Sequence, residues 1–172
     1  MIDFKNLKKL TIGGVELKQL FINGVQVWKA VSYTNQIPIS TDKSGAIYNG
    51  KGFKENTWVN AGNEGSVSGK NCTGFIPCKI GDVIRLKNIG FDNDSNNRLS
   101  FFKSDKSYIG QANGNSTWYL NSVFKGEKGS DGYYNKLTLA DNAISTGCAF
   151  IRVSCNNIDS SSIITVNQEI TD

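Results

Sequence analysis

The sequence predicts an all-β protein in which a small N-terminal β-meander is followed by a jelly-roll-like β-sandwich. Short runs of β-branched and aromatic residues alternate with polar turns, and 18 of the 172 residues are glycine. This pattern is typical of strands joined by tight turns. Helical periodicity is almost absent, and the length leaves room for one domain with a small appendage.

The meander is predicted in the stretch KKLTIGGVELKQLFINGVQVWKA. The pairs Gly13–Gly14 and Asn23–Gly24 suit two-residue hairpin turns, because Gly and Asn tolerate positive φ. Such turns join antiparallel strands. The prediction is therefore three strands, Lys8–Ile12, Val15–Ile22 and Val25–Lys29.

A meander of this size buries little apolar surface and is marginal alone, so it must pack on something. Residues 1–30 are therefore expected to form a docking segment, and residues 31–172 a β-sandwich domain. We expect Trp28, at the end of the third strand, to anchor this segment to the sandwich or to a partner subunit. The expected assembly interface consists of Leu17, Leu20, Ile22, Val25, Val27 and Trp28.

The remainder of the chain repeats the pattern of short strand and polar turn, which favours a sandwich of roughly eight to ten strands. Residues 61–70 and 125–132 are expected to be exposed loops because they are rich in Gly and polar residues. The strands are expected in the ranges Ile37–Ser40, Ala46–Tyr48, Thr73–Pro77, Val83–Leu86, Leu99–Lys103, Ser107–Ile109, Tyr133–Leu139, Ala149–Val153 and Ile163–Val166.

The absence of histidine removes several kinds of active site. Ser-His-Asp and Cys-His nucleophilic sites and His-liganded metals all require that residue. A glycosidase needs only two carboxylates, but most of those present lie in turns, where Asp and Glu are expected on structural grounds. We therefore expect a protein that is not an enzyme and holds no cofactor, with a hydrolase of cell-wall glycan as the less favoured alternative.

Charge and cysteine usage restrict the partners. The net charge of +4 is modest and the lysines are scattered, which indicates a solvated surface rather than a nucleic-acid interface. No apolar run approaches the roughly 18 residues of a membrane span, and residues 1–9 lack the apolar core of a signal peptide, so assembly in the cytoplasm is expected. The irregular spacing of Cys72, Cys78, Cys148 and Cys155 predicts buried thiols rather than zinc ligands or disulfides.

Five aromatic residues next to Asn, Ser and Gly provide one functional lead. An aromatic ring beside polar groups can stack on the C–H face of a sugar while the polar groups bind its hydroxyls. The alternative is that these rings fill the core or a contact between protomers, where Trp and Tyr are also enriched. The candidate glycan-binding residues are Trp58, Trp118, Tyr119, Tyr133 and Tyr134.

A second lead is the run Asp92-Asn93-Asp94-Ser95-Asn96, which offers oxygen atoms at alternating positions, as a calcium loop does. An EF-type loop then needs Gly at its sixth position and Glu at its twelfth, and here those positions hold Asn97 and Lys103. A looser calcium site at Asp92, Asp94 and Asn96 remains as an alternative to a plain polar turn.

The stretch KKLTIGGVELKQLFINGVQVWKA, together with TGFIPCKIGDVIRLKN and AFIRVSCNNIDSSSIITVNQEI, resembles virion structural proteins of tailed bacteriophages of low-GC Gram-positive hosts. Tail, baseplate, fibre and capsid-decoration proteins all use such modules. The resemblance implies a non-enzymatic virion component that is assembled with other virion proteins in the host cytoplasm. Symmetric self-assembly is expected, because virions are built from repeated copies. The alternative within this class is a carbohydrate-binding host-adhesion module with a cell-surface glycan as its partner.

Overall fold

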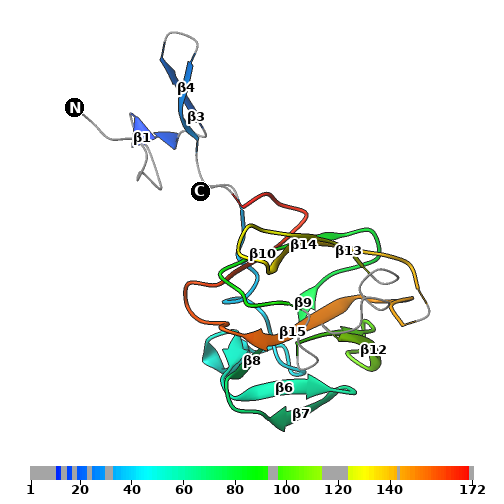
Figure 1. Ribbon diagram of the computed structural model, residues 1–172. Helices are drawn as coiled ribbons and strands as arrows, with labels where there is room; N and C mark the ends of the chain where they lie inside the picture. Colours follow the sequence, from blue (N-terminus) through cyan, green and yellow to red (C-terminus); the bar gives the residue numbers. More distant parts are fainter. Residues whose placement is uncertain are drawn as a thin grey trace. The chain divides into compact units, whose positions relative to one another are not determined.

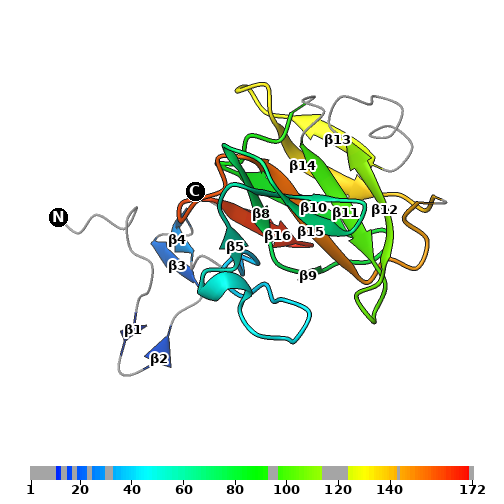
Figure 2. The same ribbon diagram turned by 90° about the horizontal axis from the view of Figure 1, so that it is seen from below.

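The computed structural model describes residues 11–12, 15–16, 19–22, 25–29, 33–92, 97–113, 124–142 and 144–170. The chain divides into two compact units: Met1–Tyr33 with the last two residues, and Thr34–Ile170. The protein is all-β, as the sequence predicts, and Figures 1 and 2 show its strands. In the described residues no helix is long and apolar enough to cross a membrane.

In its described residues, the first unit contains two hairpins within the range of the predicted meander. β1 (Thr11–Ile12) pairs with β2 (Val15–Glu16), and β3 (Gln19–Ile22) pairs with β4 (Val25–Lys29), each as a separate two-stranded sheet. The pairs Ile12–Val15 and Ile22–Val25 flank the two predicted turn positions. The expected single strand over 15–22 is described only at its two ends, because residues 17 and 18 lie outside the described residues.

The second unit is a β-sandwich with strands that pair antiparallel. One sheet has four strands in the order β13 (Phe124–Lys128), β14 (Tyr134–Leu139), β10 (Val83–Lys87), β16 (Ile163–Val166). The expected loop at 125–132 is thus partly wrong, because residues up to Lys128 form an edge strand. This strand contains Lys125, Glu127 and Lys128, charges that are typical of a protected sheet edge.

The other sheet has six strands. Its order is β12 (Tyr108–Asn113), β11 (Arg98–Phe102), β15 (Phe150–Asn156), β8 (Lys70–Thr73), β5 (Phe53–Lys54), and β9 (Ile76–Pro77) also pairs with β15. Two facing antiparallel sheets are the architecture of a sandwich or jelly roll.

A third layer covers the outer face of the six-stranded sheet (Figure 1). It is the hairpin of β6 (Thr57–Asn60) and β7 (Asn63–Ser66). The expected loop over 61–70 is therefore wrong in its first part. A positive φ at both Ala61 (47°) and Gly62 (81°) gives the two-residue hairpin turn that joins these strands, although β7 itself is polar.

Two hydrophobic clusters correspond to the two layer contacts. The larger cluster lies between the sheets, and the smaller one lies between the six-stranded sheet and the β6–β7 hairpin. β11 and β15 are consequently buried on both faces. The main members of the larger cluster are Ile37, Ile76, Ile84, Phe91, Leu99, Phe101, Leu137, Leu139, Ile151, Val153, Cys155 and Ile164, and the smaller cluster contains Tyr48, Val59, Cys72, Phe75 and Phe102.

Two predicted strands are turns in the structure. Ile37–Ser40 is a turn closed by a 3.1 Å hydrogen bond from the Ser40 amide to the Ile37 carbonyl. Ala46–Tyr48 supplies one isolated bridge and then enters the short 3-10 helix η2 (Tyr48–Gly50). Pro38, which lacks an amide donor, explains why the first segment does not join a sheet ladder.

All four cysteines are buried free thiols. Burial raises the pKa of each one, and that of Cys148 reaches about 11. Thiols with such pKa values are poor nucleophiles near neutral pH.

Candidate ligand-binding groove

Two adjoining hollows form a groove on the β-sandwich, with volumes of about 430 Å³ and about 370 Å³. Glu55 and Asp159 belong to the lining of both hollows and therefore lie at their junction. The first hollow is lined by Asn35, Ile37, Pro38, Lys51, Phe53, Glu55, Asp159, Ser160 and Ser162, and the second by Glu55, Asn56, Gly69, Asn71, Asn157, Ile158 and Asp159.

Two asparagines hold the walls of this groove together. Asn71 accepts a 3.0 Å hydrogen bond from the Asn56 amide and donates a 2.7 Å bond to the Ile158 carbonyl. Asn35 donates a 2.8 Å bond to the Ser162 carbonyl and accepts one of 3.1 Å from the Ile37 amide. Segments far apart in the sequence are therefore fixed relative to one another before any ligand arrives, which lowers the entropic cost of binding.

The loop that carries Asp159 is also fixed by its own hydrogen bonds. One carboxylate oxygen of Asp159 accepts bonds from the Ser161 amide (2.8 Å) and the Ser161 hydroxyl (2.7 Å). These bonds to Ser161 lower the pKa of the Asp159 carboxyl below its usual value, so the group is ionised at neutral pH.

Gly52 determines the path of the wall that carries Ile37 and Pro38. Its φ is +82°, and a Cβ at this position would lie 1.6 Å from the Ile37 carbonyl oxygen. The Ser40 hydroxyl completes this contact: it lies 2.7 Å from the Gly52 carbonyl oxygen and 3.0 Å from the Ile37 carbonyl oxygen. Only glycine fits between these two turns of the chain.

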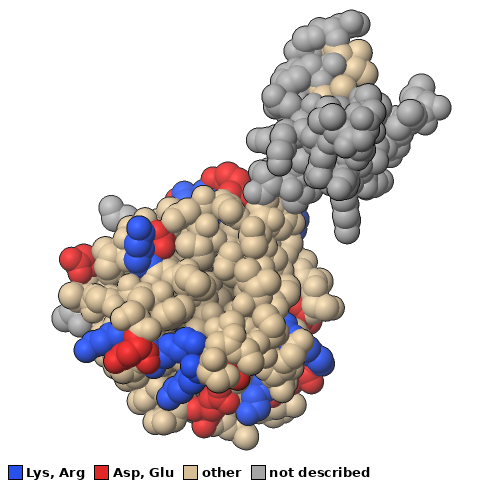
Figure 3. Space-filling view, turned by 180° about the vertical axis from the view of Figure 1, so that it is seen from behind, with Lys and Arg blue, Asp and Glu red and all other residues tan. Residues whose placement is uncertain are grey.

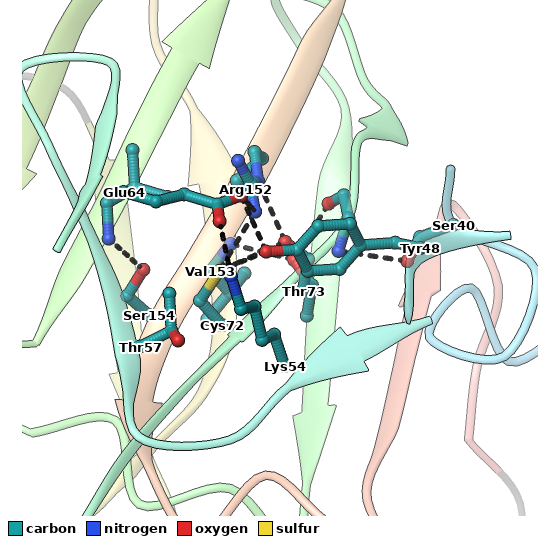
Figure 4. Close-up of polar contacts among 12 residues, drawn as sticks. Ser40, Tyr48, Lys54, Thr57, Glu64, Cys72, Thr73, Arg152, Val153 and Ser154 are labelled. Atoms are coloured by element: carbon teal, nitrogen blue, oxygen red, sulfur yellow. Dashed lines mark hydrogen bonds and ion pairs between the residues drawn. The ribbon is translucent and has the colours of Figure 1, made fainter. Parts of the chain in front are cut away.

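A polar cluster around the buried Arg152 joins β7 of the third layer to the six-stranded sheet (Figure 4). Arg152 of β15 is 4 % exposed, and its Nη2 donates a 2.9 Å hydrogen bond to Glu64 Oε1, while its Nε donates one of 2.8 Å to the Thr73 carbonyl. The Tyr48 hydroxyl donates a 2.5 Å bond to Glu64 Oε1, and Lys54 Nζ donates one of 3.2 Å to Oε2. One carboxylate on β7 thus collects donors from three other elements.

The guanidinium of Arg152 also lies between two aromatic rings. Its central carbon is 4.7 Å from the ring centroid of Tyr48 and 5.2 Å from that of Phe75. Both distances are within the range of a cation–π contact. Burial raises the pKa of the Tyr48 hydroxyl, so Tyr48 remains a donor. Because the charged groups of the cluster pair with one another and Arg152 is buried, the cluster stabilises the fold.

The pKa of Glu64 predicts a dependence of stability on pH. Burial raises this pKa, but the hydrogen bonds from Tyr48 and Arg152 outweigh burial and leave it below the ordinary value of 4.5. A lowered folded-state pKa stabilises the fold fully above the unfolded value, and this contribution is lost as pH falls through the folded value. We therefore expect Glu64→Gln to reduce the free energy of unfolding at pH 7 by about 1–2 kcal/mol, and the difference from the parent protein to shrink below pH 4.5.

Urea unfolding of both proteins between pH 7 and pH 3 measures this difference. Glu127→Gln is the matched control, because Glu127 is 65 % exposed and pairs only at the surface with Lys136. A difference between Glu64→Gln and the parent protein that is constant over this pH range would contradict the assignment.

The aromatic candidates that the structure describes do not form one site. Trp58 is half-buried in β6, where the guanidinium carbon of Arg98 lies 3.9 Å from its ring centroid. Tyr133 is 36 % exposed, and Tyr134 is half-buried in β14, with its ring edge-on to Phe91 at 6.4 Å. β6 and β14 belong to different layers (Figure 1). Trp118 and Tyr119 lie outside the described residues.

The other candidates are only partly described. Asp92 accepts a 2.5 Å hydrogen bond from Asn97 Nδ2, and Asp94 and Asn96 lie outside the described residues. Within the described part of the chain, no group of three or more His, Cys, Asp or Glu side chains could hold a metal ion.

Of the expected assembly interface, Leu20 is half-buried and Ile22 is 49 % exposed. Leu17 and the side chains of Val25, Val27 and Trp28 lie outside what the structure describes.

The groove residues were missed by sequence reasoning. Glu55 and Asp159 are about a hundred positions apart, and each resembles an ordinary turn residue. The one sequence feature that points to the groove is the high Asn, Ser and Asp content of residues 156–162, and this composition is equally typical of any surface loop.

Comparisons with models of protein families, with curated protein sequences and with solved structures found no significant match to this chain. Its function is therefore inferred from its own residues.

Proposed function

We propose that this protein is a non-enzymatic structural component of a tailed-phage virion, which docks through its N-terminal hairpins and displays its β-sandwich outward. The observation that carries the proposal is Ile22, which is 49 % exposed on β3 of a two-stranded hairpin in a unit of its own. An isolated two-stranded hairpin is marginally stable in water. Contact with a partner protein would cover such a side chain and stabilise the hairpin.

Two further observations support a structural role. The Arg152 cluster uses its charged groups for internal pairing, and histidine is absent. On the face shown in Figure 3, basic and acidic side chains are interspersed rather than gathered by sign. Mixed charge of this kind is typical of a solvated protein surface.

Particle incorporation of full-length variants tests the proposal. Ile22→Lys should reduce incorporation into virions at least about tenfold, because a charge placed in an apolar contact is left unpaired. Ile39→Lys is the matched control, since Ile39 is 50 % exposed on the sandwich and should tolerate the change. Quantitative immunoblotting of purified particles gives the ratio, and wild-type incorporation of Ile22→Lys would refute docking through this hairpin.

A carbohydrate-binding host-adhesion module is the second candidate function. The groove favours it, because carboxylate, hydroxyl and amide side chains line hollows that also contain Pro38 and Phe53. A mixture of apolar surface and placed polar groups is typical of small-ligand sites. The two functions are compatible, since a displayed virion component can carry an adhesion site.

A further inference from the structure

We infer that the groove is a two-subsite saccharide site for a non-acidic oligosaccharide, with Glu55 and Asp159 at the junction of the subsites. This inference rests on the second candidate function above. It places the site at the loops around Glu55 and Asp159, rather than at the aromatic residues that the sequence suggests.

The size of the groove suits a ligand of at least two sugar units. Each hollow, at about 430 Å³ and about 370 Å³, lies within the roughly 300–1,000 Å³ of small-molecule sites. Because the hollows share two lining residues, one elongated molecule can occupy both.

The two hollows differ in chemistry. The first has an apolar surface at the exposed Pro38, backed by the buried side chains of Ile37 and Phe53, on which the C–H face of a sugar ring can pack, with Ser160 also in its lining. The second is lined by Asn56, Asn71 and Asn157. The Asn71 amide already bonds to Asn56 and Ile158, so the side chains of Asn56 and Asn157 are the ones that can donate to sugar hydroxyls. The site thus offers one apolar platform and one polar subsite.

Glu55 and Asp159 provide the strongest acceptors in the groove, and both side chains are exposed. An ionised carboxylate only accepts hydrogen bonds, so it suits hydroxyl or amine donors on a ligand. The one basic residue in the lining, Lys51, lies 3.7 Å from Glu55 and offsets its charge. The remaining negative charge of Asp159 disfavours uronic acids, sialic acids and phosphate-bearing glycans.

The test measures binding of soluble oligosaccharides to the full-length protein by isothermal titration calorimetry. The neutral probes are cellotetraose, maltotetraose and chitotetraose, the basic probe is a chitosan tetramer, and the acidic probe is tetragalacturonate. We expect at least one neutral or basic probe to bind and the acidic probe to bind at least about tenfold more weakly.

Two conservative variants locate the site. Glu55→Gln and Asp159→Asn should each weaken binding of the neutral probe about tenfold, because each removes a charged acceptor. Their matched controls lie elsewhere on the sandwich and should bind normally. Glu127→Gln alters another exposed, Lys-paired glutamate, and Asp105→Asn alters another aspartate that accepts from the amide two residues later, at 2.8 Å.

Three results would overturn the inference: no binding of any neutral or basic probe, equal binding of the acidic probe, or binding unaffected by both groove variants. None of these results bears on virion incorporation. Failure of the saccharide site and failure of docking through Ile22 are therefore distinguishable.

Discussion

Replacing Arg152 with methionine should destabilise the β-sandwich by about 3–5 kcal/mol. Methionine keeps an unbranched apolar chain in a site that is 4 % exposed, but it removes the donors to Glu64 and to the Thr73 carbonyl. Glu64 then retains only the Tyr48 and Lys54 donors and loses its buried cation. The two cation–π contacts to Tyr48 and Phe75 are lost as well.

Urea unfolding of Arg152→Met against Arg85→Met provides the comparison. Arg85 is 17 % exposed, donates to the Gln168 carbonyl and pairs with Glu169, whose side chain is 73 % exposed, so its loss should cost clearly less than that of Arg152. Equal losses of stability in the two variants would mean that the Arg152 cluster does not hold the third layer on the sheet.

Gly52→Ala should be comparably severe, at about 3 kcal/mol or more. The added Cβ would lie 1.6 Å from the Ile37 carbonyl oxygen and 2.6 Å from its carbon, so the backbone of one wall of the groove has to move. Since both neighbours are backbone atoms, no rotamer change relieves the clash. Saccharide affinity in the first hollow should fall together with stability.

Gly45→Ala is the control that measures the loss of stability caused by a positive φ without a steric clash. Gly45 has φ +92°, and a Cβ there would meet nothing within 4 Å, so only backbone strain of about 1 kcal/mol is expected. Thermal unfolding of both variants gives the comparison. If Gly52→Ala unfolds at the same temperature as Gly45→Ala, the close contact between Gly52 and Ile37 does not constrain the fold.

The strands that the sequence predicted well are those with a buried core face. Val83–Lys87 alternates in burial, Ile163–Val166 is a short run rich in β-branched residues, and Phe150–Asn156 includes most of the apolar run Ala149–Val153 that the sequence predicts to be a strand. β7 could not be predicted in this way. It is the polar segment Asn-Glu-Gly-Ser, and its place depends on pairing with β6 and on the contact of Glu64 with Arg152.

The site was less predictable than the fold for a related reason. The sequence pattern shows that Trp58 lies among polar residues, but it does not show that Arg98 lies against its ring. It also does not show that Asn71 joins the segments of Asn56 and Ile158, because those contacts arise only from the packing of distant segments. Composition indicates which residue types are available, whereas the fold decides which of them share a hollow.

Most of the groove lining belongs to connections between strands, and only Phe53 and Asn71 lie within strands. The doubly covered strands β11 and β15 contribute no side chain to it. Substitutions at the exposed positions of those connections, such as Glu55, Asp159 and Ser160, can therefore alter ligand preference without disturbing the hydrophobic centre, to which Ile37 and Ile158 belong. In such a scaffold, the ligand bound by the groove can change from one sequence variant to the next while the β-sandwich stays the same.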